Sequence, residues 1–111
     1  TAKISAVTDT ASGLTDGTLT IGDDILIEGE KLKVDEKDPL QGVFFVTEDG
    51  GEYKTERRLS LNKPTQILAR VPKTLPEGKV SVKVRTKYSG SGAPLKEMRE
   101  LVFQYPCIAK A

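Results

Sequence analysis

Along residues 79–88, apolar and polar side chains alternate without interruption. One set of alternate positions is β-branched or aromatic: Val80, Val82, Val84, Thr86 and Tyr88. The other set is polar and mostly basic: Lys79, Ser81, Lys83, Arg85 and Lys87. A period of two places the two sets on opposite faces of a β-strand. We therefore predict a strand with one apolar face in the core and one basic face in solvent.

Weaker strand patterns recur along the rest of the chain, with turn-forming residues between them. They predict strands at residues 4–8, 24–28, 42–47, 52–61, 66–71 and 98–107. Residues 42–47 are apolar on both faces, which is typical of a central, covered strand. Asp49, Gly50 and Gly51 predict a hairpin turn after it. Gly29 interrupts the pattern that starts at residue 24 and predicts a bulge or bend.

No segment has a convincing helical period, so we predict an all-β fold. About seven or eight short strands with turns between them are typical of an immunoglobulin-like, antiparallel sandwich of two sheets. An antiparallel barrel is the alternative. The 111 residues match the size of one domain, which we expect to span residues 1–111. Because the chain starts at Thr1 rather than Met, we expect a fragment of a longer protein or a processed chain.

The composition leaves little catalytic chemistry. There is no histidine and only one cysteine, which removes histidine triads, histidine-ligated zinc and paired-cysteine sites. We therefore expect no enzymatic activity and no cofactor, and we expect Cys107 to be a buried apolar side chain. Four carboxylates around one long loop could offer oxygen ligands to calcium: Asp9, Asp16, Asp23 and Asp24. Their spacing matches no known calcium loop, so we expect turn formation and no metal.

The basic stripe, defined as Lys79, Lys83, Arg85 and Lys87, is the first candidate binding surface. It either keeps a sheet face soluble or grips phosphates weakly and without sequence preference. Lys54 and Arg58 could extend it, with Glu56 between them. The net charge of +1 argues against a dedicated nucleic-acid binder. With 5% aromatic residues and no tryptophan, we expect no stacking platform for bases or sugars.

The segment of residues 88–97 is the second candidate surface. β-Sandwiches bind through loops held at their ends, and this loop contains two glycines and a proline. Its candidate contact residues are Tyr88, Ser89, Ser91 and Lys96. The alternative is a flexible connection without a binding role.

Several motifs together resemble a known family. They include Gly13-Leu-Thr-Asp-Gly-Thr-Leu-Thr20, Gly42-Val-Phe-Phe-Val46, and Tyr88-Ser89 followed by Leu95-Lys-Glu97. Over nearly the whole chain, the pattern resembles the uncharacterised Ig-like domain found C-terminal to a bacterial HU-like DNA-binding domain. The resemblance implies an accessory domain of a DNA-associated protein and assigns no ligand residues.

We predict a non-catalytic interaction domain that mediates docking to a protein partner or self-association, with DNA reached through an attached domain. One alternative is weak contact of the basic stripe with the DNA backbone. The other is a surface adhesin or glycan-binding module, which would need an export signal upstream of Thr1. We expect a cytoplasmic, nucleoid-associated protein, with the cell surface as the alternative. We expect no membrane partner, because no apolar run approaches the roughly 18 residues of a membrane helix.

Overall fold

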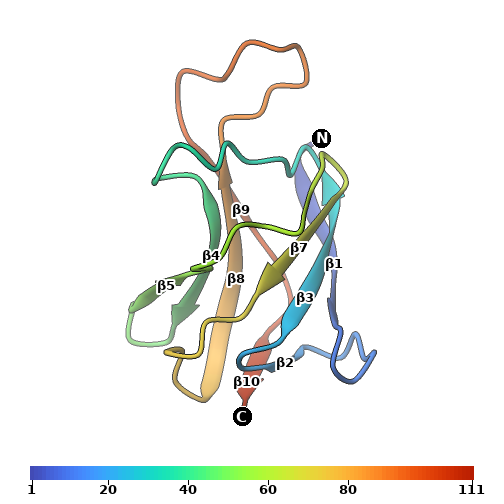
Figure 1. Ribbon diagram of the computed structural model, residues 1–111, viewed down its shortest axis with the longest axis vertical. Coiled ribbons are helices and arrows are strands. Elements are labelled where there is room, and N and C mark those ends of the chain that lie inside the picture. Colours follow the sequence, from blue (N-terminus) through green and yellow to red (C-terminus); the bar gives the residue numbers. More distant parts are fainter.

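The alternating segment forms the long strand β8 (Gly78–Thr86), as predicted. Its β-branched face is buried, with Val82, Val84 and Thr86 fully inaccessible to solvent. The computed structural model describes residues 1–111, and all of its regular elements are strands (Figure 1). The structure contains no helix long and apolar enough to span a membrane.

The ten strands divide between two sheets. The four-stranded sheet has the order β1 (Lys3–Asp9), β3 (Asp24–Glu30), β7 (Gln66–Arg70) and β6 (Leu61–Asn62). The six-stranded sheet has the order β2 (Thr18–Thr20), β10 (Cys107–Lys110), β8, β4 (Gly42–Thr47) and β5 (Glu52–Lys54), with β9 (Arg99–Val102) paired to β8. All neighbouring strands are antiparallel except β2 and β10.

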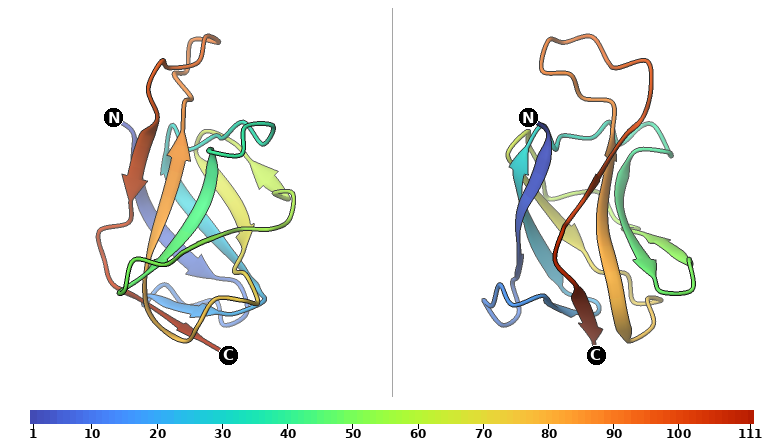
Figure 2. Two further views of the ribbon diagram at one scale, coloured as in Figure 1. Left: turned by 90° about the vertical axis from the view of Figure 1, so that its left-hand side faces the viewer. Right: turned by 180° about the vertical axis from the view of Figure 1, so that it is seen from behind.

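The two sheets pack face to face as an open sandwich (Figure 2). No strand of one sheet pairs with a strand of the other, so the barrel alternative is wrong and the predicted sandwich is confirmed. One cluster of 20 buried apolar residues fills the space between them. Ile25, Ile27 and Ile67 meet Phe45 and Val82 in this core. Burying each such side chain contributes about 1.5–3 kcal/mol, which is how alternation in the sequence becomes a layered fold.

Strand β4 is covered on both faces, but only one face is covered by the core. Phe45 points inward and is fully buried, while Phe44 lies on the outer face and is still 8% exposed. Lys54 and Arg85 cover the Phe44 ring, with the Arg85 guanidinium carbon 4.4 Å and the Lys54 Nζ 5.6 Å from its centroid. Long basic side chains therefore replace a second layer over this part of the sheet.

The predicted strand at residues 52–61 is wrong. Strand β5 ends at Lys54, and residues 55–60 cross to the other sheet, where β6 pairs with β7. Thr55 fixes the crossing, because its amide donates to the Val43 carbonyl and its hydroxyl donates to the Arg70 carbonyl of the opposite sheet. These bonds join residues far apart in the chain, so no local pattern marks the exit.

The predicted strand at residues 98–107 is also wrong as one element. Strand β9 ends at Val102, and β10 starts at Cys107 and runs parallel to β2. Phe103 is buried, but Tyr105, two residues further on, is 66% exposed. The chain leaves β8 after β9 and returns to it at the opposite end, beside Val80.

The bulge predicted at Gly29 of β3 lies in the neighbouring strand β1, opposite this glycine. The register between β1 and β3 skips Ser5, so the bulge is in β1. A Cβ atom on Gly29 would lie 2.0 Å from the Lys3 carbonyl oxygen. The glycine is required because the bulged backbone of β1 approaches it this closely.

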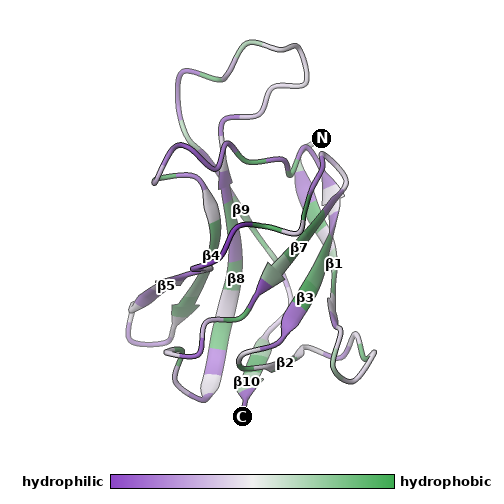
Figure 3. Cartoon of the chain, viewed as in Figure 1, coloured by the Kyte–Doolittle hydropathy of each residue, from purple (hydrophilic) through white to green (hydrophobic).

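The connecting segments of residues 31–41 and 87–98 gather at one end of the sandwich, where the amino terminus also lies (Figures 1 and 2). The carboxyl terminus lies at the opposite end. Strands β3, β7 and β8 alternate in hydropathy, whereas the segment at residues 31–41 is mostly polar (Figure 3). This end therefore holds exposed polar loops on a rigid frame, an arrangement suited to binding.

Candidate functional site

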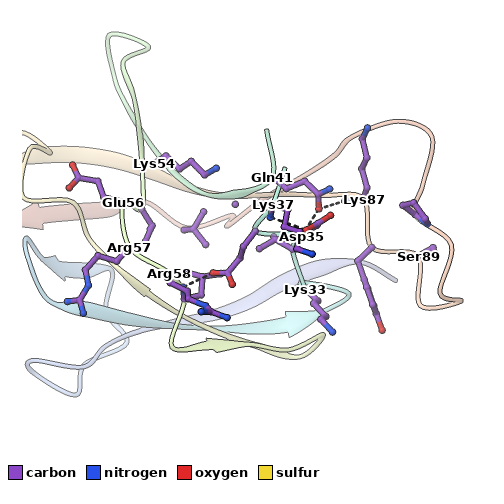
Figure 4. A pocket seen from close by; sticks show the side chains of 18 of the residues that line it. Lys33, Asp35, Lys37, Gln41, Lys54, Glu56, Arg57, Arg58, Lys87 and Ser89 are labelled. Carbon is purple, nitrogen blue, oxygen red and sulfur yellow. Dashed lines mark hydrogen bonds between the residues drawn. The ribbon is translucent and has the colours of Figure 1, made fainter. Parts of the chain in front are cut away.

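A cleft of about 950 Å³ opens between the connecting segments at the amino-terminal end (Figure 4). It is lined by residues 33–37, 41–43, 54–59, 87–89 and 92–94. Its size falls in the range of about 300–1,000 Å³ that is usual for ligand-binding clefts. Three segments distant in the sequence therefore form one concave surface.

The cleft is strongly basic although the chain as a whole is nearly neutral. Its lining includes six cations, Lys33, Lys37, Lys54, Arg57, Arg58 and Lys87. It includes three carboxylates, Asp35, Glu36 and Glu56, which leaves a net charge of +3 against +1 for the whole chain. None of the five ion pairs of the protein includes a cleft cation. Positive charge concentrated in a concave surface attracts anions.

Two of the cleft carboxylates bind the loop backbone instead of neutralising the cations. Glu36 accepts a hydrogen bond from the Leu59 amide at 2.7 Å, and Asp35 accepts one from the Lys37 amide at 3.0 Å. Just outside the lining, hydrogen bonds from the Leu40 amide and the Gln41 side chain hold the pKa of Asp38 below its usual value. Asp35, Glu36 and Asp38 thus fix the loop conformation. Among the cleft cations, Lys54 is itself held in place, because its Nζ donates to the Pro39 carbonyl at 2.8 Å and lies over the Phe44 ring.

Gln41 ties two walls of the cleft together. It is 5% exposed, and its Oε1 accepts hydrogen bonds from the Asp35 amide at 3.0 Å and the Lys87 amide at 3.2 Å. Its Nε2 donates to Asp38 Oδ2 at 3.2 Å. Figure 4 shows Gln41 between Asp35 and Lys87. A buried side chain thus sets the distance between the segment before β4 and the segment after β8.

Thr86, the last residue of β8, makes a second tie. Its hydroxyl donates to the Lys33 carbonyl and accepts a hydrogen bond from the Tyr88 amide at 3.0 Å. Thr86 is fully buried, so the segments of Lys33 and Tyr88 share one fixed anchor. The core-facing pattern of β8 therefore ends in a side chain that anchors two of the segments lining the cleft.

The structure separates the members of the basic stripe. Lys83 pairs with Glu100 at 3.3 Å, and Arg85 binds both oxygens of Glu52 at 2.8 and 3.0 Å and Glu100 at 2.8 Å. These hydrogen bonds lower the pKa of both carboxyls and raise the pKa of Arg85. Lys79 lies near the far end of β8, and Lys87 lies beyond the strand in the cleft. The two central cations are therefore already neutralised.

The contact-loop residues divide between the cleft and the loop tip. Tyr88 and Ser89 line the cleft, whereas Ser91 and Lys96 do not. The Ser89 hydroxyl lies 2.9 Å from the Ser91 hydroxyl and also donates to the Ala93 carbonyl. The Leu95 amide donates to the Lys87 carbonyl at 2.7 Å, which closes the base of the loop.

Lys54 lies beside Arg85 of the basic stripe, over the Phe44 ring, and also lines the cleft. Arg58 lies in the cleft, with Glu56 between the two residues in the chain. Sequence reasoning missed Lys33, Lys37 and Arg57 altogether. The only local signal was the high density of charged residues in the segments around them. Solvated loops without a binding role have the same high density, so this signal does not identify a site.

The carboxylates weighed as calcium ligands have separate structural roles. Asp9 is buried and accepts hydrogen bonds from Ser12 and from the amide and hydroxyl of Thr20. Asp24 pairs with Arg70 at 3.2 Å. No group of three histidine, cysteine, aspartate or glutamate residues is close enough to hold a metal ion.

Cys107 is fully buried in the core, as predicted. Burial raises the pKa of its thiol to about 11. At neutral pH the group is therefore a protonated, apolar side chain.

Comparison with known proteins places this chain in a family. A solved structure, that of a "putative bacterial DNA binding protein" from Bacteroides vulgatus ATCC 8482, is similar with a TM-score of 0.86 and 27% sequence identity. The similarity covers 97% of this chain and 47% of that protein, so this chain spans about half of its length. No curated protein matches the sequence. Residues 3–101 match the model of a domain of unknown function (DUF4469) with an Ig-like fold, and the chain belongs to this family.

Proposed function

We propose that this domain is a non-catalytic accessory module of a DNA-binding protein and that its basic cleft contacts the phosphate backbone without sequence preference. The observation that carries the proposal is the set of six cleft cations, none of them paired with a carboxylate. This assigns DNA contact to the loop end rather than to the outer face of β8.

The physical basis is counterion release. Each lysine or arginine that neutralises a phosphate frees condensed cations from the DNA, so affinity falls steeply with salt. With about four contacts, the slope of log affinity against log salt would be near −3.6, and affinity would fall roughly 150-fold from 50 to 200 mM. Because the whole chain has a net charge of only +1, long-range attraction between DNA and the rest of the domain is weak, and the cleft supplies most of it.

The similar structure supports this proposal, because that protein is named a "putative bacterial DNA binding protein" and is about twice as long as this chain. We further propose that an HU-like DNA-binding domain precedes Thr1 in a cytoplasmic, nucleoid-associated protein. The amino terminus lies at the end of the sandwich that holds the cleft (Figure 1). DNA held by a domain attached there would be close to the cleft, and tethering makes even a weak contact effective.

The non-catalytic part of the proposal is supported by the chemistry of the cleft. Its lining contains neither histidine nor cysteine. Two of its three carboxylates are committed to loop amides. The remaining groups suit electrostatic binding better than acid–base or nucleophilic catalysis.

The test is a fluorescence-anisotropy titration of labelled duplex DNA at about 50 and 200 mM salt. The cleft variant is Lys37→Gln with Arg58→Gln. The matched control is Lys63→Gln with Lys73→Gln, which removes the same charge from exposed positions outside the cleft. We expect the cleft variant to lose affinity and to reduce the salt slope by about 1.8, and the control to change little. Equal losses in both variants, or no binding by the wild type, would contradict the proposal.

Docking is the second candidate function, and one observation favours it. Val102 and Tyr105, on either side of the exit from β9, are 44% and 66% exposed. Exposed apolar side chains close together in the chain are candidates for a protein interface. Sedimentation velocity of the domain over a wide concentration range tests self-association, which Val102→Thr with Tyr105→Ser should abolish. A monomer at every concentration would exclude self-association. The surface-adhesin alternative stays a prediction.

A further inference from the structure

We propose that the cleft accepts single-stranded DNA in preference to duplex, with one base stacked on the ring of Tyr88. This inference rests on the proposed function, because the same cations would hold the flanking phosphates. It goes beyond that function by assigning the strandedness of the ligand and the residue that selects it. It also replaces the expectation, drawn from composition, that the chain has no surface on which a base could stack.

The shape of the cleft gives the first reason. In a duplex the base faces are covered by their neighbours, so a protein reaches only base edges and the backbone. A single strand can instead turn a base face toward the protein. A cavity of about 950 Å³ has room for an unpaired nucleotide.

The state of the Tyr88 ring gives the second reason. Tyr88 is half-buried and lines the cleft. Its hydroxyl makes no hydrogen bond within the protein, and its ring has no aromatic or cationic partner. The aromatic pair of the structure is Phe103 with Tyr105, and the ring covered by cations is Phe44. Tyr88 is thus a ring without a partner in a basic cleft.

The backbone around Tyr88 is fixed before any ligand binds. The Tyr88 amide donates to the buried Thr86 hydroxyl, and the Lys87 amide donates to the buried Gln41 side chain. The Lys87 carbonyl accepts from the Leu95 amide. A ring presented from a fixed backbone loses little conformational entropy on stacking.

Two of the cleft cations are carried by backbone close to that of Tyr88. Lys87 precedes it in the chain, and the Lys33 carbonyl accepts from the same Thr86 hydroxyl that holds the Tyr88 amide. A stacking ring among cations that follow a backbone is the combination by which proteins bind single strands. Stacking of one base on one ring changes affinity on the order of tenfold.

The test compares labelled oligothymidine of about 12 nucleotides with a duplex of the same length at low salt. We expect the wild type to bind the single strand about tenfold more tightly. Tyr88→Leu should lose this advantage and leave duplex affinity unchanged, while Tyr88→Phe should keep it. Because the two DNAs are compared on one variant, a general loss of folding cannot imitate the expected result.

Tyrosine fluorescence gives an independent readout, since the chain has three tyrosines and no tryptophan. In a Tyr53→Phe, Tyr105→Phe background, Tyr88 is the only emitter, and oligothymidine should quench it. Equal affinity for both DNAs, or binding without quenching, would overturn the inference and leave phosphate contact intact. Absence of binding to either DNA would overturn both proposals.

Discussion

The guanidinium carbon of Arg85 lies 4.4 Å from the centre of the Phe44 ring on the outer face of the six-stranded sheet. From this position Arg85 binds both oxygens of Glu52 on β5 and one oxygen of Glu100 on β9. One side chain on β8 thus crosses β4 and connects strands on both sides. A residue that the alternation placed in a free basic stripe has a structural role in the sheet.

Replacing Arg85 with alanine should destabilise the domain by about 1–2 kcal/mol, the combined size of a cation–π contact and two partly exposed ion pairs. The variant also uncovers Phe44. Urea unfolding measures the loss. Lys79→Ala is the matched control, because Lys79 makes no ion pair and covers no ring. An Arg85→Ala variant as stable as the control would show that the network contributes nothing.

The same network predicts a loss of stability in acid. Hydrogen bonds from Arg85 lower the pKa of Glu52 and Glu100 from the ordinary value of 4.5. As the pH falls below that value, the unfolded chain takes up protons before these native carboxylates do, which favours unfolding. The contribution is therefore complete above about pH 5 and is lost as the pH falls through the lowered native pKa values.

The measurement is the unfolding midpoint as a function of pH in the wild type and in Glu52→Gln with Glu100→Gln. The variant should be less stable at neutral pH, and the difference should shrink in acid. A difference that stays constant down to about pH 3 would contradict this assignment.

Gly29→Ala should destabilise the domain by about 2–3 kcal/mol, because its Cβ would lie 2.0 Å from the Lys3 carbonyl oxygen and one strand would have to move. Gly50→Ala is the control. Gly50 has space around it and carries only the strain of its φ of 90°, so about 1 kcal/mol is expected. Urea unfolding distinguishes them, and equal losses would mean that β1 moves away easily.

Cys107 should report global unfolding. Its thiol is fully buried and has a pKa of about 11, so a thiol-reactive disulfide should label the native domain only when it opens. The labelling rate should rise in Gly29→Ala in proportion to the population of the open state. Rapid labelling of the native wild type would instead reveal local opening of β10.

The contrast between β8 and the cleft shows what the sequence could predict. The strand was predictable because its period of two is a local signal. The exit after Lys54 and the start of β10 were not, because hydrogen bonds between distant segments determine them. The cleft cations come from three separate segments and share no period, so only the packed sandwich brings them together. Neutralisation of Arg85 likewise depends on strand order rather than on spacing.

The role of Gln41 links stability to the cleft. Gln41→Leu leaves the Asp35 and Lys87 amides without their shared acceptor, which should cost about 2 kcal/mol. It should also weaken DNA binding, because the segments that carry Lys37 and Lys87 are no longer held at a fixed distance. Gln66→Leu is the control, since the Gln66 side chain makes one long hydrogen bond, to Glu28 at 3.4 Å, away from the cleft.

Urea unfolding and anisotropy with the same labelled DNA separate the two effects. Below the unfolding transition Gln41→Leu is still folded, so any loss of affinity comes from the cleft itself. Lower stability with wild-type affinity would mean that the two segments need no tie to present their cations. Loss of both, with the control unchanged, would show that the buried side-chain amide of Gln41, just before β4, sets the geometry on which phosphate contact depends.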